Sequence, residues 1–142
     1  MMSEADLPAK VTLAWLGDQR YRATNAAGAE IFLDSDRVAG LSPMESLLAS
    51  VSGCMAIDVV MILEKMRLDL TSLHVEMEGE RVETTPRYFR RVLFRFHIGG
   101  KVPKDKVERA IQLSFDKYCS VFHSLRKDLE VETSCTFDAD DG

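Results

Sequence analysis

The chain has 142 residues and a net charge of −5, and 46% of its residues are apolar. This length and composition predict one globular domain over residues 1–142, with loose tails at 1–9 and 138–142. The acidic balance argues against nucleic acid or an anionic membrane as a partner. No run of about 18 apolar residues occurs, and residues 1–10 lack a signal-peptide core, so we expect a cytoplasmic protein without a membrane partner.

The chain opens with segments typical of short strands. Large apolar residues alternate over residues 11–15, which predicts a strand with one buried face. Residues 21–24 and 30–33 predict two more strands, joined by a hairpin turn at 25–28. Arg20 and Arg22 share one face of the middle strand, where such side chains normally meet solvent.

A long helix predicted over residues 42–65 organises the rest of the chain. Ser42 and Glu45 have the spacing of a capping box, and Pro43 suits the first helical position. Small residues crowd the middle of the helix around Cys54, so another element or a second copy of this helix can approach closely. A thiol in such a place is usually a small hydrophobic side chain. The apolar positions with helical spacing are Met44, Leu47, Leu48, Val51, Met55, Val59 and Ile62.

The second half of the chain predicts a β-hairpin, two helices and a final strand. Alternating residues at 73–77, extending toward 82, and at 92–98 predict the hairpin, with Gly99-Gly100 ending its second strand. Pro103 opens the next helix, and a short third helix is predicted over residues 121–126. The last strand covers residues 129–137. This order of elements predicts an α+β fold.

The cysteines and histidines do not form a familiar metal site or disulfide framework. The three cysteines are Cys54, Cys119 and Cys135, and an odd number at wide spacing does not fit a secreted disulfide-bonded protein. Cys135 shares an apolar strand face and is interpreted as a core residue. The three histidines show no ligand spacing in the sequence, so each is interpreted as structural or exposed, and no metal site is expected.

Cys119 and Asp58 have surroundings that favour a chemical role. Cys119 lies between two predicted helices, where the neighbouring Lys117 and a helix N-terminus would favour a thiolate. Asp58 lies one turn after Cys54 within an apolar run, and a buried carboxylate needs a partner. We expect it to bond a backbone group, meet an arginine or tune the thiol.

Two blocks of the sequence carry a resemblance to a known family. The first is Ser42-Pro43-x-Glu45-x-Leu47-Leu48, continued by Gly53-Cys54-x-Ala56-x-Asp58-Val59-Val60-x-Ile62-Leu63, and the second is Ser114-x-x-x-Tyr118-Cys119-Ser120-Val121. With their cysteines 65 residues apart, these blocks resemble the OsmC/Ohr family of osmotically inducible and organic hydroperoxide resistance proteins. The resemblance runs from about residue 11 to residue 137 and is greatest to the OsmC-like branch.

The resemblance implies an OsmC-like fold, assembled as an intertwined homodimer with two central helices and sites at the subunit interface. It also implies a thiol peroxidase for oxidative stress defence. Cys54 would attack an organic hydroperoxide and become a sulfenic acid, and Cys119 would then form a disulfide with it. An external dithiol would reduce that disulfide, and no other cofactor is expected. The pocket around the thiols is expected to be apolar and lined by Met44, Leu48, Met55 and Phe122.

Two positions depart from the family pattern. The well-studied peroxidases carry a glutamate directly after the helix-opening proline, whereas this chain has Met44 there and the acid at Glu45. One step along a helix turns a side chain by about 100°. Those peroxidases also carry an arginine in the turn of the N-terminal hairpin, which is missing here.

These departures lead to one hypothesis and one alternative. The hypothesis is that Arg20 or Arg22 reaches Cys54, held there by Glu45 or Asp58, and stabilises its thiolate. The alternative is a non-catalytic OsmC-like protein that binds a small hydrophobic ligand or senses oxidants at the same interface.

Overall fold

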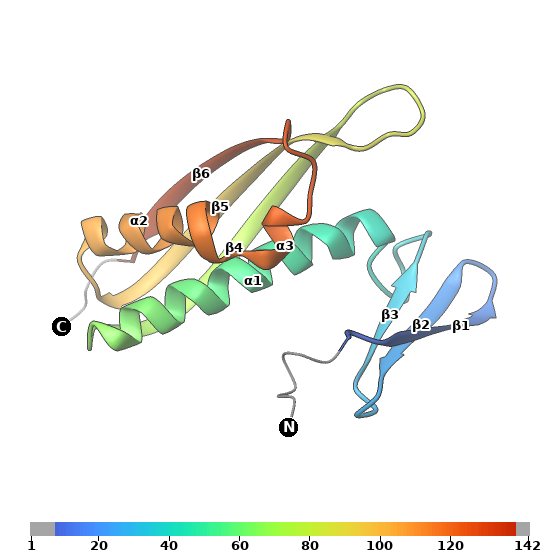
Figure 1. Cartoon of the computed structure of the whole chain (residues 1–142), viewed down its shortest axis with the longest axis horizontal. Coiled ribbons are helices and arrows are strands. Elements are labelled where there is room, and N and C mark those ends of the chain that lie inside the picture. The colour runs from blue at the N-terminus through green and yellow to red at the C-terminus, as the bar shows by residue number, and fades with distance from the viewer. Residues whose placement is uncertain (1–7, 139–142) are drawn as a thin grey trace. The chain divides into compact units, whose positions relative to one another are not determined.

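The computed structural model describes residues 8–138, so residues 1–7 and 139–142 of the predicted tails lie outside the described part. The chain divides into two compact units, Met1–Leu47 and Leu48–Gly142, and each is described by itself. The elements follow the predicted order of strands, long helix, hairpin, helices and last strand (Figure 1). The predicted α+β class is therefore confirmed.

The first unit is a three-stranded antiparallel sheet in the order β1-β2-β3. Its strands are β1 (Val11–Gly17), β2 (Arg20–Asn25) and β3 (Glu30–Asp34). The predicted turn between β2 and β3 is confirmed. The Asn25 side-chain oxygen accepts hydrogen bonds from the N–H groups of Ala27 and Ala29, each at 3.0 Å, and Gly28 supplies the positive φ of 91°.

The buried face predicted for the first strand is wrong for the single chain. Val11, Leu13 and Trp15 are 66%, 57% and 69% exposed. Within the described residues 8–47, the unit holds no helix beyond the first turn of α1, so its sheet has no layer of its own to cover this face. The alternation of residue types predicted the strand correctly, but not what would cover it.

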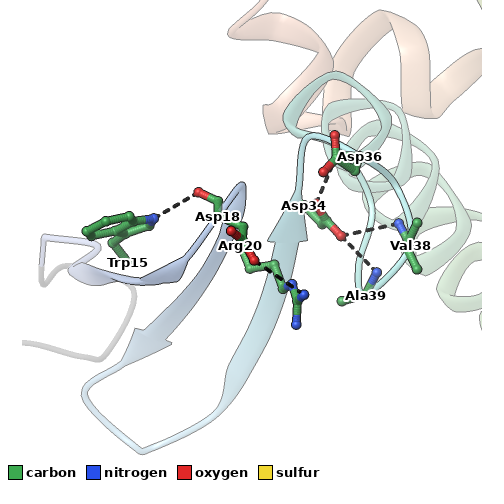
Figure 2. A network of polar contacts seen from close by, with 7 residues as sticks. All are labelled: Trp15, Asp18, Arg20, Asp34, Asp36, Val38 and Ala39. Atoms are coloured by element: carbon green, nitrogen blue, oxygen red, sulfur yellow. Dashed lines mark hydrogen bonds and ion pairs between the residues drawn. The ribbon is translucent and has the colours of Figure 1, made fainter.

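The loop between β3 and the long helix is organised by the buried carboxylate of Asp34 (Figure 2). Its Oδ1 accepts the N–H of Asp36 at 2.9 Å, and its Oδ2 accepts the N–H groups of Val38 at 3.3 Å and Ala39 at 2.9 Å. The N–H groups of Ala39 and Asp36 lower the pKa of Asp34 below its usual value, because they stabilise the ionised form. One carboxylate thus fixes the turn that leads toward the helix.

The long helix α1 (Pro43–Lys65) begins and ends where the sequence predicted. The capping box is present: Ser42 Oγ accepts the Glu45 N–H at 3.1 Å, and Glu45 Oε1 accepts the Ser42 N–H at 2.9 Å. By length and composition alone α1 could cross a membrane, a test that core helices of soluble proteins also pass. One side of it is buried in the described structure through Val51, Ser52, Met55, Val59 and Leu63.

The second unit holds a sheet in the order β4-β5-β6. The strands are β4 (Asp69–Arg81), β5 (Phe89–Lys101) and β6 (Glu130–Phe137), with β5 antiparallel to β4 and parallel to β6. The prediction that Gly99-Gly100 ends the strand is wrong, because both glycines pair with β4. At Gly100 the φ is +114°, and a Cβ there would lie 2.2 Å from the Asp69 carbonyl oxygen, so the strand continues through an irregularity that requires glycine.

Helices pack on one face of this sheet (Figure 1). They are α1, α2 (Lys104–Leu113), the wide π-helical turn η2 (Ser114–Tyr118) and α3 (Ser120–His123). The predicted third helix is therefore shorter and begins one residue earlier. The inward residues of β5 alternate with outward ones and form the centre of the core with α1 and α2. The fully buried large side chains are Phe94, Phe96, Met55, Leu63, Ile98, Val59 and Val107.

Candidate functional site

Cys54 lies about three turns into α1, and its side chain is half-buried at the edge of the core. The neighbouring Gly53 is exposed, and a Cβ added to it would meet nothing within 4 Å. The backbone beside Cys54 is therefore open to an approaching molecule. This matches the small-residue zone that the sequence predicted around the thiol.

Cys119 is held at the junction of two short helical turns. The π-turn η2 widens the chain after α2, and the Cys119 N–H donates to the Ser114 carbonyl at 2.8 Å. Cys119 then takes an extended conformation and caps α3, with its Sγ accepting the Phe122 N–H at 3.4 Å. The Phe122 ring packs edge-on against Phe115 with centroids 5.1 Å apart. Short π-helical turns are frequent at functional sites.

The structure brings the two thiols together from distant parts of the sequence. Cys119 is fully buried, and its thiol donates to the Val51 carbonyl at an S···O distance of 3.9 Å. Val51 lies one turn before Cys54 on α1. The Cys54 side chain packs against the core cluster that includes Cys119 and lies near enough to raise the pKa of the buried thiol. This arrangement places a buried thiol near a half-buried one.

The pKa of Cys119 is raised to about 11, mainly because burial removes water from the thiolate. The Phe122 N–H lowers it in part, whereas the hydrogen bond and charge of Cys54 and the charge of Asp58 raise it further. The prediction that the surroundings of Cys119 favour a thiolate is therefore wrong in its net effect, although the α3 N-terminus acts in the predicted direction. The α3 contribution is present, but desolvation outweighs it.

Asp58 has a hydrogen-bond partner that was not predicted from the sequence. Its Oδ2 accepts the hydroxyl proton of Ser114 at 2.7 Å, and Ser114 itself is fully buried. This bond ties α1 to the first residue of the π-turn and so helps to place Cys119. The sequence did single out Ser114, which stands at the start of the second sequence block. It did not show the pairing, because Asp58 lies 56 residues away from Ser114.

The other supporting side chains belong to the first unit, whereas both thiols belong to the second. Glu45 is engaged in the capping box. Arg22 Nε lies 3.9 Å from Glu30 Oε2, and Arg20 Nη2 lies 3.7 Å from Asp18 Oδ2 (Figure 2). The contact of Arg20, Arg22 or Glu45 with the thiols therefore stays a prediction.

A groove of about 400 Å³ begins at Asp58, one turn from Cys54, and is mostly apolar. The predicted pocket residues do not line it. Met55 is fully buried, Leu48 and Phe122 are half-buried against the core, and Met44 is half-buried in the first turn of α1. The groove is lined by Asp58, Met61, Ile62, Lys65, Met66, Leu113 and Tyr118.

The remaining cysteine and two of the histidines lie on the second sheet. Cys135 is half-buried on the core side of β6, opposite Phe96, and burial raises its pKa. The interpretation of every histidine as single is wrong for two of them. His74 and His97 face each other across β4 and β5, and Glu76 lies beside them. Two histidines and a carboxylate are side chains that could hold a metal ion.

Comparison with known proteins gives the family. Residues 34–134 match the family model described as OsmC-like protein. The Escherichia coli K12 protein YhfA is 38% identical over 122 residues, which covers 84% of this chain and 91% of YhfA. A hypothetical protein from Aquifex aeolicus VF5 has a similar crystal structure, with a TM-score of 0.81 and 28% identity over 93% of this chain and 98% of that one.

A more distant structure has a name that mentions a function. It is an organic hydroperoxide resistance protein, OsmC, from Legionella pneumophila, also described as a predicted redox protein. Its TM-score is 0.69 at 15% identity, over 94% of this chain and 99% of that one, so it shows the fold alone. The family match covers most of the chain and includes both thiols: this chain belongs to the OsmC-like protein family.

Proposed function

We propose that this protein is a two-cysteine thiol peroxidase that reduces organic hydroperoxides in oxidative stress defence. The observation that carries the proposal is the proximity of Cys54 and Cys119, which come from segments 65 residues apart. One thiol is half-buried and the other is fully buried. Membership of a family with a peroxide-resistance protein among its structural neighbours supports the same class of chemistry.

The proposed reaction has three steps. The Cys54 thiolate attacks the terminal oxygen of ROOH, an S–O bond forms, the O–O bond breaks, and RO⁻ takes a proton to leave as ROH. Cys119 then attacks the sulfur of the Cys54 sulfenic acid, the S–S bond forms, and water leaves. A small dithiol finally reduces the disulfide and is itself oxidised to a disulfide, which returns both cysteines to thiols.

The arrangement suits an apolar hydroperoxide and needs no further cofactor. The groove at Asp58 offers Met61, Ile62 and Leu113 to an alkyl chain, one helical turn from Cys54. Three cysteines at wide spacing do not form a secreted disulfide framework, which suits a reducing cytoplasm. We therefore place the reaction in the cytoplasm, with a cellular dithiol as the reductant.

We expect the protein to be a homodimer. Apolar side chains are exposed on both units of the single chain, including Trp15 at 69% and Ile31 at 57% on the first sheet and Ile57 at 62% and Met61 at 51% on α1. Exposed apolar surface of this extent usually marks an interface. Sedimentation equilibrium at micromolar concentration should give about twice the chain mass of 16.0 kDa. A stable species at the mass of one chain would contradict the dimer.

Oxidation by a mild organic hydroperoxide should join Cys54 to Cys119 within one chain and leave Cys135 as a free thiol. A sulfenic acid condenses with the nearest thiol, and Cys119 lies near Cys54, whereas Cys135 lies on β6 facing the core. Peptide mapping without reductant measures the pairing. Cys135→Ser is the matched control and should leave the bridge unchanged, whereas a bridge that includes Cys135 would overturn the scheme.

A second function is favoured by the apolar groove and by the side chains that depart from the family pattern. In this alternative the protein binds a small hydrophobic ligand or senses oxidants without turnover. Glu45 is occupied by the helix cap, and Arg22 faces Glu30 on its own sheet. A hydroperoxide-loss assay with dithiol as reductant separates the two functions. Loss of peroxide that depends on enzyme and dithiol supports the peroxidase, and saturable ligand binding without turnover supports the alternative.

A further inference from the structure

The outward face of the second sheet carries a cluster that the proposed peroxidase chemistry does not use. His74 on β4 is directly opposite His97 on β5, and Glu76 follows two residues along β4 on the same face. The two rings are stacked, with centroids 4.4 Å apart and 22° between their planes. The ligand atoms that the three side chains offer all lie within 4.8 Å of one another.

His97 is held in an orientation that suits a metal ligand. Its Nδ1 lies 2.6 Å from Thr136 Oγ1 on β6, the strand that pairs with β5. Metal-binding histidines almost always use their second ring nitrogen in such a bond to an oxygen atom. With the Nδ1 proton donated to Thr136, the other nitrogen, Nε2, presents its lone pair.

That lone pair has no hydrogen-bond partner among the described residues 8–138. His97 Nε2 is buried from solvent and has no hydrogen bond, although Glu76 Oε1 lies only 2.9 Å away. The distance is that of an ion pair, but the alignment is not that of a hydrogen bond. In this tautomer two electron-rich atoms therefore face each other, and a cation bound to both would relieve the repulsion.

The neighbouring charges leave the cluster available. Arg95 is opposite Glu76 on β5, but its Nη1 pairs with Glu78 at 3.1 Å. His74 and Glu76 are both exposed, so the cluster is open on its solvent side. A metal ion could thus reach His74 and Glu76 from outside, and a movement of these exposed side chains would bring it to His97 Nε2 with a water molecule as its fourth ligand.

We propose that His74, Glu76 and His97 form a binding site for a divalent transition metal ion, for which Zn²⁺ is the best match. Two imidazoles and one carboxylate with an open fourth position are a common zinc ligand set. Ligand atoms in a tetrahedral zinc site lie on the order of 3.3 Å apart. Separations of up to 4.8 Å must therefore close by at most roughly 1.5 Å, which is a side-chain movement.

The site is independent of the two thiols. Phe96 and Ile98 point into the core that includes Cys119, whereas His97 between them points to the outward face. Bound metal would join β4 to β5 directly and attach β6 through Thr136. We expect it to stabilise the sheet in the folded state, because a ligand that binds only the folded protein raises its stability.

The test is a titration of the full chain with Zn²⁺, in which calorimetry measures the binding and NMR monitors the histidine side chains. We expect one ion per chain, with movement of the His74 and His97 imidazole signals and none at His123, the third histidine. His74→Gln, His97→Gln and Glu76→Gln should each weaken binding at least about tenfold. Thr136→Val should weaken it by about 10- to 100-fold through the loss of the outer hydrogen bond.

Two controls distinguish this site from other ways of holding zinc. Glu80→Gln removes a carboxylate from the same strand that pairs with Arg90 and so does not release Arg95, and it should leave the affinity unchanged. Repeating the titration with all three cysteines replaced by serine removes the thiols as ligands. If this variant fails to fold, the histidine signals of the wild-type chain still decide. Unmoved His74 and His97 signals, or binding lost with the thiols but kept in His97→Gln, would overturn the proposal.

Discussion

Cys54→Ser should lower the rate of dithiol-dependent reduction of an organic hydroperoxide by about a thousandfold or more. The proposed mechanism forms its first S–O bond at Cys54, and a serine hydroxyl does not ionise at neutral pH to replace a thiolate. Losses of this size or larger follow when the nucleophile of a covalent mechanism is removed. Stopped-time measurement of residual hydroperoxide, with a small dithiol in excess, gives the rate.

The other two cysteines make this test specific. Cys135→Ser is the matched control, because Cys135 is half-buried on the core side of β6, and it should keep the wild-type rate. Cys119→Ser should still react once, and the Cys54 sulfenic acid should then persist long enough for a carbon nucleophile to trap it. Peroxide reduction that continues in Cys54→Ser would contradict the proposed peroxidase, and no turnover in the wild type would favour ligand binding.

The local elements of this fold could be predicted from the sequence because their causes are local. The α1 helix begins at the capping box of Ser42 and Glu45, and the two bonds of that box are present. The hairpin turn at Asn25 follows from one side-chain oxygen and a glycine. What failed was the burial of β1, since alternation shows that one face is apolar but not which surface will cover it.

The site was harder to predict, because its contacts join residues far apart in the sequence. The family resemblance predicted the pair Cys54 and Cys119, and the structure places these residues near each other in one core cluster. Local charge around Cys119 suggested a thiolate, but burial by packing cannot be read from Lys117 or from a helix N-terminus. The pairing of Asp58 with Ser114 depends on how α1 meets the π-turn, which sequence periodicity does not specify.

The distance along the sequence also explains why the pairing of His74 with His97 was not predicted. His74 and His97 are 23 residues apart, so no linear ligand spacing links them, but the β4–β5 register sets them side by side. The signal available in the sequence was the hairpin itself. Counting outward from its turn aligns the two outward faces, and the register, rather than the spacing along the chain, shows which side chains meet.

The Cys119 thiol should react with an alkylating reagent about a hundred times more slowly at neutral pH than an ordinary thiol. A pKa of about 11 in place of 9.0 lowers the thiolate fraction by that factor, and the thiolate is the reactive form. The rate should rise tenfold per pH step up to about pH 11. The variant Cys54→Ser/Cys135→Ser isolates this thiol, and because burial is the main cause, its alkylation midpoint should stay above 9.

The folded state should also lose stability in the same pH range. In the unfolded chain Cys119 ionises near pH 9.0, whereas the folded chain holds the proton until about pH 11. The contribution of Cys119 is thus fully present below pH 9 and is lost as the pH rises through 11. Urea unfolding of the wild type and of Cys119→Ala from pH 7 to 10.5 isolates the contribution of Cys119. A difference in unfolding free energy between the two that does not change with pH would contradict the raised pKa. In the proposed cycle, a protonated Cys119 would resist direct oxidation by peroxide, so that Cys54 would react first.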